Sequence, residues 1–309
     1  MIVKFDTYYL FLWYDISGEY KMVKNVQDNF DNLIEYKLYR NVRDLIHPSI
    51  SKRNISDYKI ILNDDLLPVR VFYPKKVSNL KKVLIYIPGD GKVTDSYGKY
   101  TSISKDLAIK TNRCLITIDY FENGIKYPDT IDKIYEVILY LYQQLHEIGI
   151  KDEDIVLIGD SFGGNLVNAM NIKFIEDGYD YIKKCVLYYP MISMDYENDT
   201  LYESFESNTK FDLLTMNTCK TFIKNYSNSD DPLVKVLNYD KLDKFPRFMV
   251  ITGDIDPLRD EGKDFFDHLN KKDNVYFNLE SNTHGFLKYI HTMKDDVYDE
   301  MNKFINEEG

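Results

Sequence analysis

A serine set between two glycines is the first sign of chemistry in this chain. The segment Leu157–Asn165, LIGDSFGGN, places Ser161 between Gly159 and Gly163 with the spacing G-x-S-x-G. An apolar, β-rich run precedes the serine and a helical pattern follows it, which predicts a sharp strand-to-helix turn. There the N-terminus of the helix would direct free N–H groups and a positive dipole end toward the hydroxyl. The pattern predicts a nucleophile, and a small residue filling a tight loop is the alternative.

A serine hydroxyl is a weak nucleophile until a neighbouring imidazole takes its proton. Among the five histidines, His284 lies in ESNTHGFL, five residues after the last strand-like run and directly before Gly285. The others lie in the N-terminal segment or in helical patterns: His47, His146, His268 and His291. We therefore predict that His284 is the general base, although a single histidine is more often structural.

A carboxylate should hold the imidazole in the right tautomer. The candidates follow two consecutive strand-like runs and are Asp195, Asp254, Asp256, Asp260 and Glu261. Spacing alone does not choose between Asp254 and Asp256, and an aspartate at the start of a helix is often only a cap. Pro257 suits a first helical position, which would place Asp256 at the switch from strand to helix. The chain order Ser, Asp, His is that of α/β-hydrolases.

Alternating strands and helices are expected to bring these residues to one edge of a sheet. Seven runs are predicted strands: 69–73, 83–87, 114–119, 155–159, 185–189, 248–253 and 275–279. Helical spacing of apolar residues occurs at 130–148, 163–177, 258–272 and 286–306. Several runs are continuously apolar, as in strands covered on both faces. The pattern predicts an α/β fold with a doubly wound, mostly parallel sheet and a site at its carboxyl-terminal edge.

Two segments interrupt this alternation. Residues 1–50 and the acidic, tyrosine-rich residues 195–242 do not follow the strand–helix repeat. We expect both to pack over the carboxyl edge as a helical cap on a single domain that spans residues 1–309. The acidic stretch 195–206, DYENDTLYESFE, would disfavour anionic esters at the entrance, or it forms an ordinary solvated helix face.

The composition argues against several other functions. The 309 residues carry a net charge of −11, which disfavours nucleic acid or an anionic membrane as a partner. Three cysteines without C-x-x-C spacing indicate neither a disulfide framework nor a zinc site. The apolar run 8–14, YYLFLWY, lacks the flanks of a signal peptide and is too short to span a bilayer. We expect a cytoplasmic protein without a membrane span, as a monomer or homodimer.

Three sequence blocks, in this order, resemble one family. GDSFGGN, DPLRDEG and HGF resemble the signature blocks of the hormone-sensitive-lipase-like α/β-hydrolase esterases, and the likeness extends over about residues 65–306. The resemblance implies that Ser161 is the nucleophile, Asp256 the acid and His284 the base. It also implies an α/β-hydrolase fold with a cap, a small-molecule ester substrate with a short to medium acyl chain, and no cofactor.

The loop after the predicted strand 83–87 departs from that family. Where the family has H-G-G-G, this chain has PGDGK, so Pro88 replaces the histidine and Asp90 replaces the middle glycine. Backbone N–H groups of this loop and of the residue after the nucleophile bind the oxyanion in acyl transfer. By position these donors are Asp90, Gly91 and Phe162. An inward Asp90 carboxylate would repel the oxyanion, and Phe162, in place of a small residue, would narrow the acyl pocket.

Three functions are compatible with these residues. The first is a serine carboxylesterase or deacylase that works through an acyl-enzyme. The second is an amide or formamide hydrolase of the kynurenine-formamidase kind, which shares the triad and a related glycine loop. The third is a non-catalytic receptor of the same fold. Such receptors usually lose a member of the triad, so the complete set of Ser161, Asp256 and His284 favours an enzyme.

Overall fold

The N-terminal part of the chain contains short strands. The computed structural model describes residues 3–5, 8–10, 12–14, 20–22, 42–44, 55–60, 66–74, 82–89, 97–120, 126–196, 202–208, 214–269, 273–288 and 295–307. The first ranges are the strands β1 (Val3–Phe5), β2 (Tyr8–Leu10), β3 (Leu12–Tyr14), β4 (Tyr20–Met22), β5 (Val42–Asp44) and β6 (Ile55–Ile60). Every described residue of segment 1–50 lies in a strand, so the helices predicted there are wrong for these residues. The aromatic residues of the run 8–14 favour strands.

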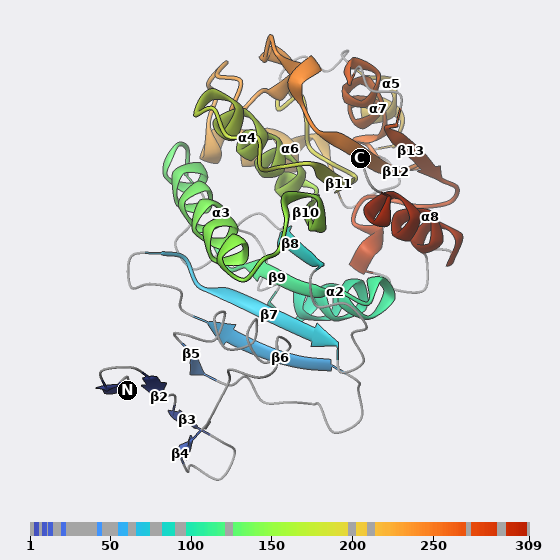
Figure 1. The fold of residues 1–309 in the computed structure, drawn as a ribbon. Coiled ribbons are helices and arrows are strands. Elements are labelled where there is room, and N and C mark those ends of the chain that lie inside the picture. The colour runs from blue at the N-terminus through green and yellow to red at the C-terminus, as the bar shows by residue number, and fades with distance from the viewer. Residues whose placement is uncertain are drawn as a thin grey trace.

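Nine strands of the described chain form one sheet, in the order β13-β12-β11-β10-β8-β9-β7-β6-β5 (Figure 1). The further strands are β7 (Val69–Pro74), β8 (Val83–Ile87), β9 (Cys114–Ile118), β10 (Ile155–Asp160), β11 (Lys184–Tyr188), β12 (Arg247–Gly253) and β13 (Val275–Leu279). From β13 to β9 all neighbours run parallel, and β7, β6 and β5 continue the sheet antiparallel. The seven predicted strands are confirmed, with ends that differ by at most one residue.

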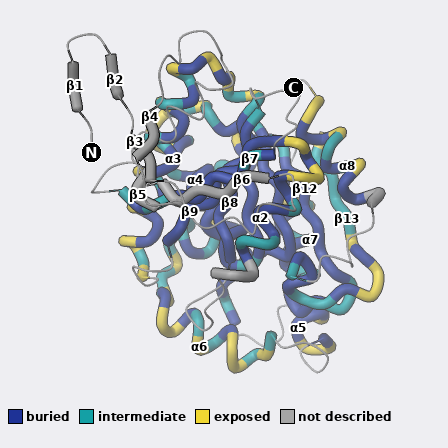
Figure 2. The backbone as a smooth tube through the Cα atoms, turned by 90° about the horizontal axis from the view of Figure 1, so that it is seen from below, coloured by how far each residue is buried: buried dark blue, intermediate teal, exposed yellow. Residues whose placement is uncertain are grey.

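The central strands are buried on both faces, as their continuous apolar sequence predicts (Figure 2). Alternate residues of β8 enter different cores: Val83 and Ile85 pack on one side, Leu84 and Tyr86 on the other. This alternation follows from the two-residue period of a strand. The sheet therefore separates two hydrophobic cores, each covered by its own helices.

Helices cover both faces of the sheet. The helices α3 (Asp129–Glu147), α4 (Phe162–Glu176) and α7 (Arg259–His268) belong to one core, and α2 (Tyr97–Thr111) and α8 (Asp295–Asn306) to the other. The predicted helices 130–148 and 163–177 are confirmed within one residue. The prediction 258–272 is too long, because α7 ends at His268. The prediction 286–306 is wrong at its start, where Phe286–Lys288 forms a 3-10 turn and α8 begins only at Asp295.

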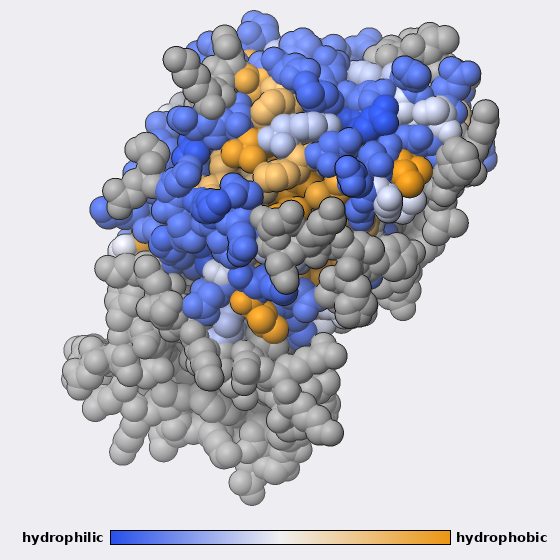
Figure 3. All heavy atoms as spheres, turned by 90° about the vertical axis from the view of Figure 1, so that its right-hand side faces the viewer, coloured by the Kyte–Doolittle hydropathy of each residue, from blue (hydrophilic) through white to orange (hydrophobic). Residues whose placement is uncertain are grey.

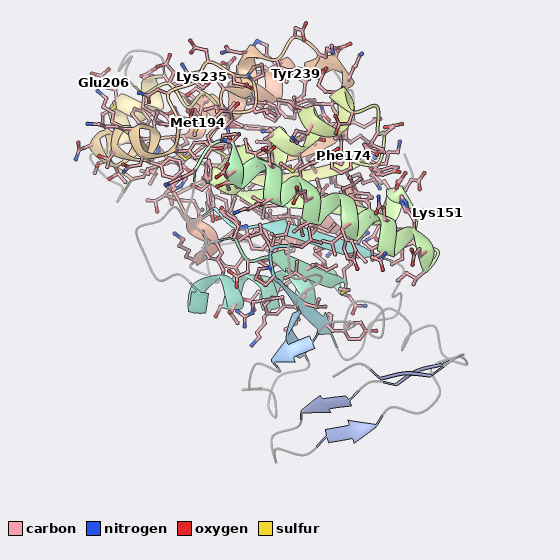
Figure 4. The ribbon with its side chains drawn as sticks, turned by 90° about the vertical axis from the view of Figure 1, so that its left-hand side faces the viewer. Lys151, Phe174, Met194, Glu206, Lys235 and Tyr239 are labelled. Carbon is pink, nitrogen blue, oxygen red and sulfur yellow. The ribbon has the colours of Figure 1, made fainter. Side chains whose placement is uncertain are left out.

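The segment 195–242 is partly helical. It contains α5 (Glu203–Asn208), α6 (Met216–Tyr226) and a 3-10 turn at Val236–Asn238. Thr215 caps α6, since its hydroxyl accepts the N–H of Thr218. Figure 4 shows Glu206, Lys235 and Tyr239 of this segment at the end of the molecule far from the short N-terminal strands. Among the described residues, none of the helices has the length and apolar character that a membrane span requires.

Candidate active site

Ser161 lies at a sharp turn between β10 and α4. Its backbone has φ 52° and ψ −123°, a strained conformation for a residue with a Cβ. Its N–H donates to the carbonyl of Tyr188 at 2.9 Å, and its carbonyl accepts the N–H of Met191 at 2.9 Å. A Cβ on Gly163 would lie 2.1 Å from the Ile87 carbonyl oxygen, so the turn approaches β8 too closely for any residue but glycine at this position. The turn therefore places Ser161 between the last residue of β10 and the first residue of α4.

His284 reaches the serine from the loop that follows β13. Its Nε2 lies 2.8 Å from Ser161 Oγ, a hydrogen-bond distance. The imidazole is 11% exposed, so little solvent competes for this contact. The ring of Tyr189 packs edge-on against it, with ring centres 4.8 Å apart. The structure thus brings together two residues that are 123 positions apart in the sequence.

Asp256 faces the other nitrogen of the imidazole. Both of its carboxylate oxygens lie 3.1 Å from His284 Nδ1, and the side chain is fully buried. Its Oδ1 also accepts the N–H of Leu258 at 2.8 Å. The helix α7 begins at Arg259, so the prediction that Pro257 is the first helical residue is wrong. The tight turn between Asp256 and Leu258 delays the helix by two residues.

The other acidic candidates have different partners. Asp254 Oδ1 accepts the N–H of Asn282 at 3.1 Å, which ties the loop after β12 to the histidine loop. Asp195 lies 3.9 Å from Lys235 Nζ, and Asp260 contacts Arg259 at 2.7 Å. The geometry therefore separates Asp256 from Asp254, which the spacing in the sequence did not.

The other histidines have different surroundings. His146 Nε2 contacts Asp152 at 2.6 Å, and His268 Nδ1 contacts the carbonyl of Asp264 on its own helix at 2.8 Å. Both histidines lie at the C-terminal ends of helices, within predicted helical patterns. His47 and His291 lie outside the residues that the structure describes.

Sequence reasoning missed the residues that support the Asp256 turn. The amide of Asn208, at the end of α5, donates to the carbonyls of Asp254 at 3.2 Å and Asp256 at 3.1 Å. Ser204 on the same helix donates to the carbonyl of Pro257 at 2.9 Å. Asparagine and serine at the start of an acidic segment carry no periodic signal. Only the proximity of α5 to α7 in space reveals this role.

The predicted oxyanion donors are only partly described. Phe162 is the first residue of α4, where N–H groups have no acceptor within the helix. Asp90 and Gly91 lie outside the described residues, so their assignment stays a prediction. The Phe162 ring is buried and packs edge-on against Phe222 and Tyr226 of α6, each at 4.8 Å. The residue after the serine thus connects the turn to the segment 195–242.

Comparison with known proteins places this geometry in a family. A family model for the alpha/beta hydrolase fold matches residues 84–288, which are 205 of the 309 residues and include the serine, the aspartate and the histidine. The chain belongs to this family. An esterase of the archaeon Pyrobaculum calidifontis has the same fold as this α/β-hydrolase, with a TM-score of 0.69 over 91% of each chain at 22% identity.

The curated relatives of this α/β-hydrolase include esterases. The chain is 26% identical to an arylesterase of Saccharolobus solfataricus, over 83% of this chain and 87% of the relative. It is 30% identical to an esterase of Acinetobacter venetianus, over 66% of this chain and 67% of the relative. The chain is thus a hormone-sensitive-lipase-like hydrolase, an enzyme that acts on carboxylic ester bonds.

Two further buried carboxylates surround the site of this α/β-hydrolase. Glu261 accepts hydrogen bonds from the N–H of Ile192 and the hydroxyls of Ser193 and Tyr196, at 2.8 to 3.1 Å. Burial and, to a smaller extent, the nearby Asp256 raise the pKa of Glu261 to about 7, against the effect of these hydrogen bonds. Asp160, directly before the serine, is also fully buried, and its burial likewise raises its pKa.

Proposed function

We propose that this hydrolase is a serine carboxylesterase that cleaves esters with short to medium acyl chains through Ser161, His284 and Asp256. One observation carries the proposal: an unbroken series of hydrogen-bond distances runs from Ser161 Oγ through both imidazole nitrogens to a buried carboxylate. Such a series matches the requirements for general-base activation of a hydroxyl.

The geometry supports a two-step acyl transfer. His284 Nε2 takes the proton of Ser161 as Oγ attacks the ester carbonyl, and the imidazolium then gives this proton to the leaving alcohol. Water attacks the resulting acyl-enzyme by the same route and releases the carboxylic acid. Asp256 keeps Nδ1–H directed toward its own carboxylate and stabilises the imidazolium.

We propose that the N–H of Phe162, with those of Asp90 and Gly91, binds the oxyanion formed in each step. Its place at the first residue of α4 supports this role, because the helix N-terminus favours negative charge. Losing one such donor typically costs about 2.7–4 kcal/mol of transition-state stabilisation. We also propose that α5 and α6 form part of a cap, since α6 covers the Phe162 ring and α5 holds the acid loop.

Covalent labelling tests this function. An aryl sulfonyl fluoride or an organophosphate should add one group per chain to Ser161, in parallel with loss of p-nitrophenyl acetate hydrolysis. The variant Ser161→Ala should lose both the adduct and the turnover. Absence of an adduct and of turnover in the wild-type protein would contradict the proposal. Ligand-induced thermal stabilisation that persists in Ser161→Ala, without turnover, would instead favour a non-catalytic receptor.

An amide hydrolase is the second candidate. A rat arylacetamide deacetylase is 26% identical over 63% of this chain, although the chain covers only half of that relative. The same triad would serve, with an amine as the leaving group that receives the proton from His284. Rates on p-nitrophenyl acetate, 4-nitroacetanilide and N-formyl-kynurenine separate the two functions. We expect the aryl ester to have the highest kcat/KM.

A further inference from the structure

A second buried carboxylate lies directly beside the nucleophile and is not a member of the triad. Asp160 is the last residue of β10 and is fully buried. Its Oδ1 accepts the hydroxyl of Tyr86 at 2.6 Å and the backbone N–H of Gly89 at 2.9 Å. Its Oδ2 accepts the hydroxyl of Tyr189 at 3.2 Å. Three donors from two other segments therefore converge on one side chain.

One of these donors leads to the oxyanion loop. Gly89 is the residue before Asp90, at the start of the segment expected to supply two oxyanion donors. A Cβ on Gly89 would lie 1.7 Å from the carbonyl oxygen of Asp160, so the two backbones are in direct contact. Tyr86, on β8, leads into the same loop. Asp160 thus fixes the point at which this loop leaves the sheet.

Another donor leads to the general base. Tyr189 follows β11 with a positive φ of 36°, and its N–H donates to the carbonyl of Ile251 at 2.7 Å. This conformation directs its hydroxyl to Asp160 while its ring packs edge-on against His284 at 4.8 Å and against Phe286 at 4.7 Å. The ring therefore supports the face of the imidazole, and the hydroxyl anchors the ring.

The two tyrosine hydroxyls that donate to Asp160 keep their protons. Burial and the neighbouring Asp160 raise the pKa of both Tyr86 and Tyr189, so their hydroxyls stay protonated. Burial is the largest influence on Asp160 and raises its pKa, whereas the hydrogen bond from Tyr86 and the positive charge of Lys288 favour its charged form. His284 itself is faced by Ser161 and Asp256 directly, and by Asp160 across the Tyr189 ring.

We propose that Asp160 is a positioning residue that couples the oxyanion loop, through Gly89, to the general base, through Tyr189 and His284. This inference rests on the proposed esterase function. It adds to that function a residue that holds the oxyanion loop and the general base in fixed positions relative to each other. The expected consequence is kinetic. Loosening either connection lowers the rate of the acyl-transfer step and leaves ester binding little changed.

The test compares three variants that each remove one tyrosine hydroxyl that donates to a carboxylate. Tyr86→Phe and Tyr189→Phe break the bonds to Asp160, whereas Tyr239→Phe removes a hydroxyl that donates to Glu176 at 2.7 Å, at the opposite end of α4 from Ser161. We expect kcat for p-nitrophenyl acetate to fall about tenfold in the first two variants, with KM within about twofold. The control variant should keep kcat within about twofold of the wild-type value.

The charge of Asp160 has its own signature. Above its raised pKa, Asp160 is a negative charge near the imidazolium, so in Asp160→Asn the acid limb of the kcat/KM profile should move to lower pH. A role in folding alone would leave this limb unchanged. Wild-type kcat in both Tyr86→Phe and Tyr189→Phe would refute the coupling even if Asp160→Asn does not fold. A wild-type protein without esterase activity would refute the proposed function itself, and this inference with it.

Discussion

At the scale of single residues, the site depends on what two aspartates of the same turn contact. Asp256 directs both oxygens to His284, whereas Asp254, two residues earlier, accepts the N–H of Asn282. The sequence could place an acid in this turn but could not choose between the two, because the choice depends on the path of the backbone. The Asx-type bond from Leu258 N–H to Asp256 sets that path.

This difference predicts unequal effects of two matched substitutions. Asp256→Asn should lower kcat by about 10⁴-fold, as the corresponding change does in serine proteases, because the amide favours the wrong imidazole tautomer. Asp254→Asn keeps an oxygen that can accept from Asn282 and should lower kcat by less than about tenfold. Steady-state hydrolysis of p-nitrophenyl acetate, with circular dichroism to verify folding, measures both. Equal losses in the two variants would contradict the assignment of the acid.

Glu261 predicts a pH dependence of stability. Its pKa is raised to about 7 in the folded protein, above its usual value of 4.5, so folding is favoured while this group is protonated. The contribution is fully present below about pH 4.5 and is lost as pH rises through 7, for a total of about 3 kcal/mol. In Glu261→Gln the free energy of unfolding should vary less between pH 4.5 and 7 than it does in the wild-type protein. Urea unfolding between pH 4.5 and 7.5 measures the difference.

The matched control for this experiment is Glu280→Gln, since Glu280 is exposed in the turn after β13. Its unfolding curve should follow that of the wild-type protein at every pH. If Glu261→Gln also runs parallel to the wild type across the window, then Glu261 does not titrate with a raised pKa in the folded protein.

At the scale of elements, α6 and the turn after β10 form one aromatic contact. Phe222 and Tyr226 stack on each other at 6.0 Å and both pack edge-on against Phe162. Phe162 is adjacent to Ser161, the proposed nucleophile, so we expect this contact to limit the space next to the ester carbonyl. A large side chain at this position had suggested a narrow acyl pocket, but the sequence alone did not say which element closes it.

We therefore expect Phe222→Ala to extend the acyl range. The change opens volume beside Phe162 without touching the triad, and each added methylene of a bound chain is worth about 1–3 kcal/mol in an apolar pocket. The ratio of kcat/KM for p-nitrophenyl octanoate to that for acetate should rise at least about tenfold. Phe266→Ala is the control. Phe266, on α7, is also partly buried, but its ring packs against Tyr276 on β13. Equal ratios in both variants would exclude α6 as the wall.

The strands were predictable because their signal is local, whereas several helices depend on contacts distant in sequence. Apolar runs such as 83–87 and 155–159 give strands directly. The helix α2, which the sequence analysis did not identify, contains Gly98 and several serine and threonine residues, so its pattern is weak. It is stabilised by burial of Ile103 and Leu107 against the sheet. The support that α5 gives to Asp256 depends in the same way on tertiary packing.

At the scale of the whole molecule, charge should influence which esters reach the site. The chain carries −11, and α5, beside the acid loop, exposes Glu203 and Glu206. On the face shown in Figure 3, hydrophilic residues surround a band of hydrophobic ones. A negative field of this kind raises the local concentration of cations and lowers that of anions.

At low salt, we expect kcat/KM to be highest for an ester with a positively charged acyl group and lowest for one with a negatively charged acyl group. Among p-nitrophenyl esters of similar length, one with a trimethylammonium end should exceed the neutral pentanoate, and the hemisuccinate should be slowest, with steps of roughly two- to tenfold. Raising the salt from 20 to 500 mM should bring the three values together, because the Debye length falls from about 20 Å to about 4 Å. The neutral ester provides the control for unspecific effects of salt.

Two pairs of charge-reversal substitutions test which part of the surface produces this negative field. Glu203→Lys with Glu206→Lys changes the net charge from −11 to −7, and Glu136→Lys with Glu147→Lys on α3 does the same elsewhere on the surface. If the acidic face of α5 borders the entrance, the first pair should reduce the preference for the cationic ester more than the second. Equal reductions would assign the effect to net charge alone, and no reduction in either would show that charge does not select the substrate.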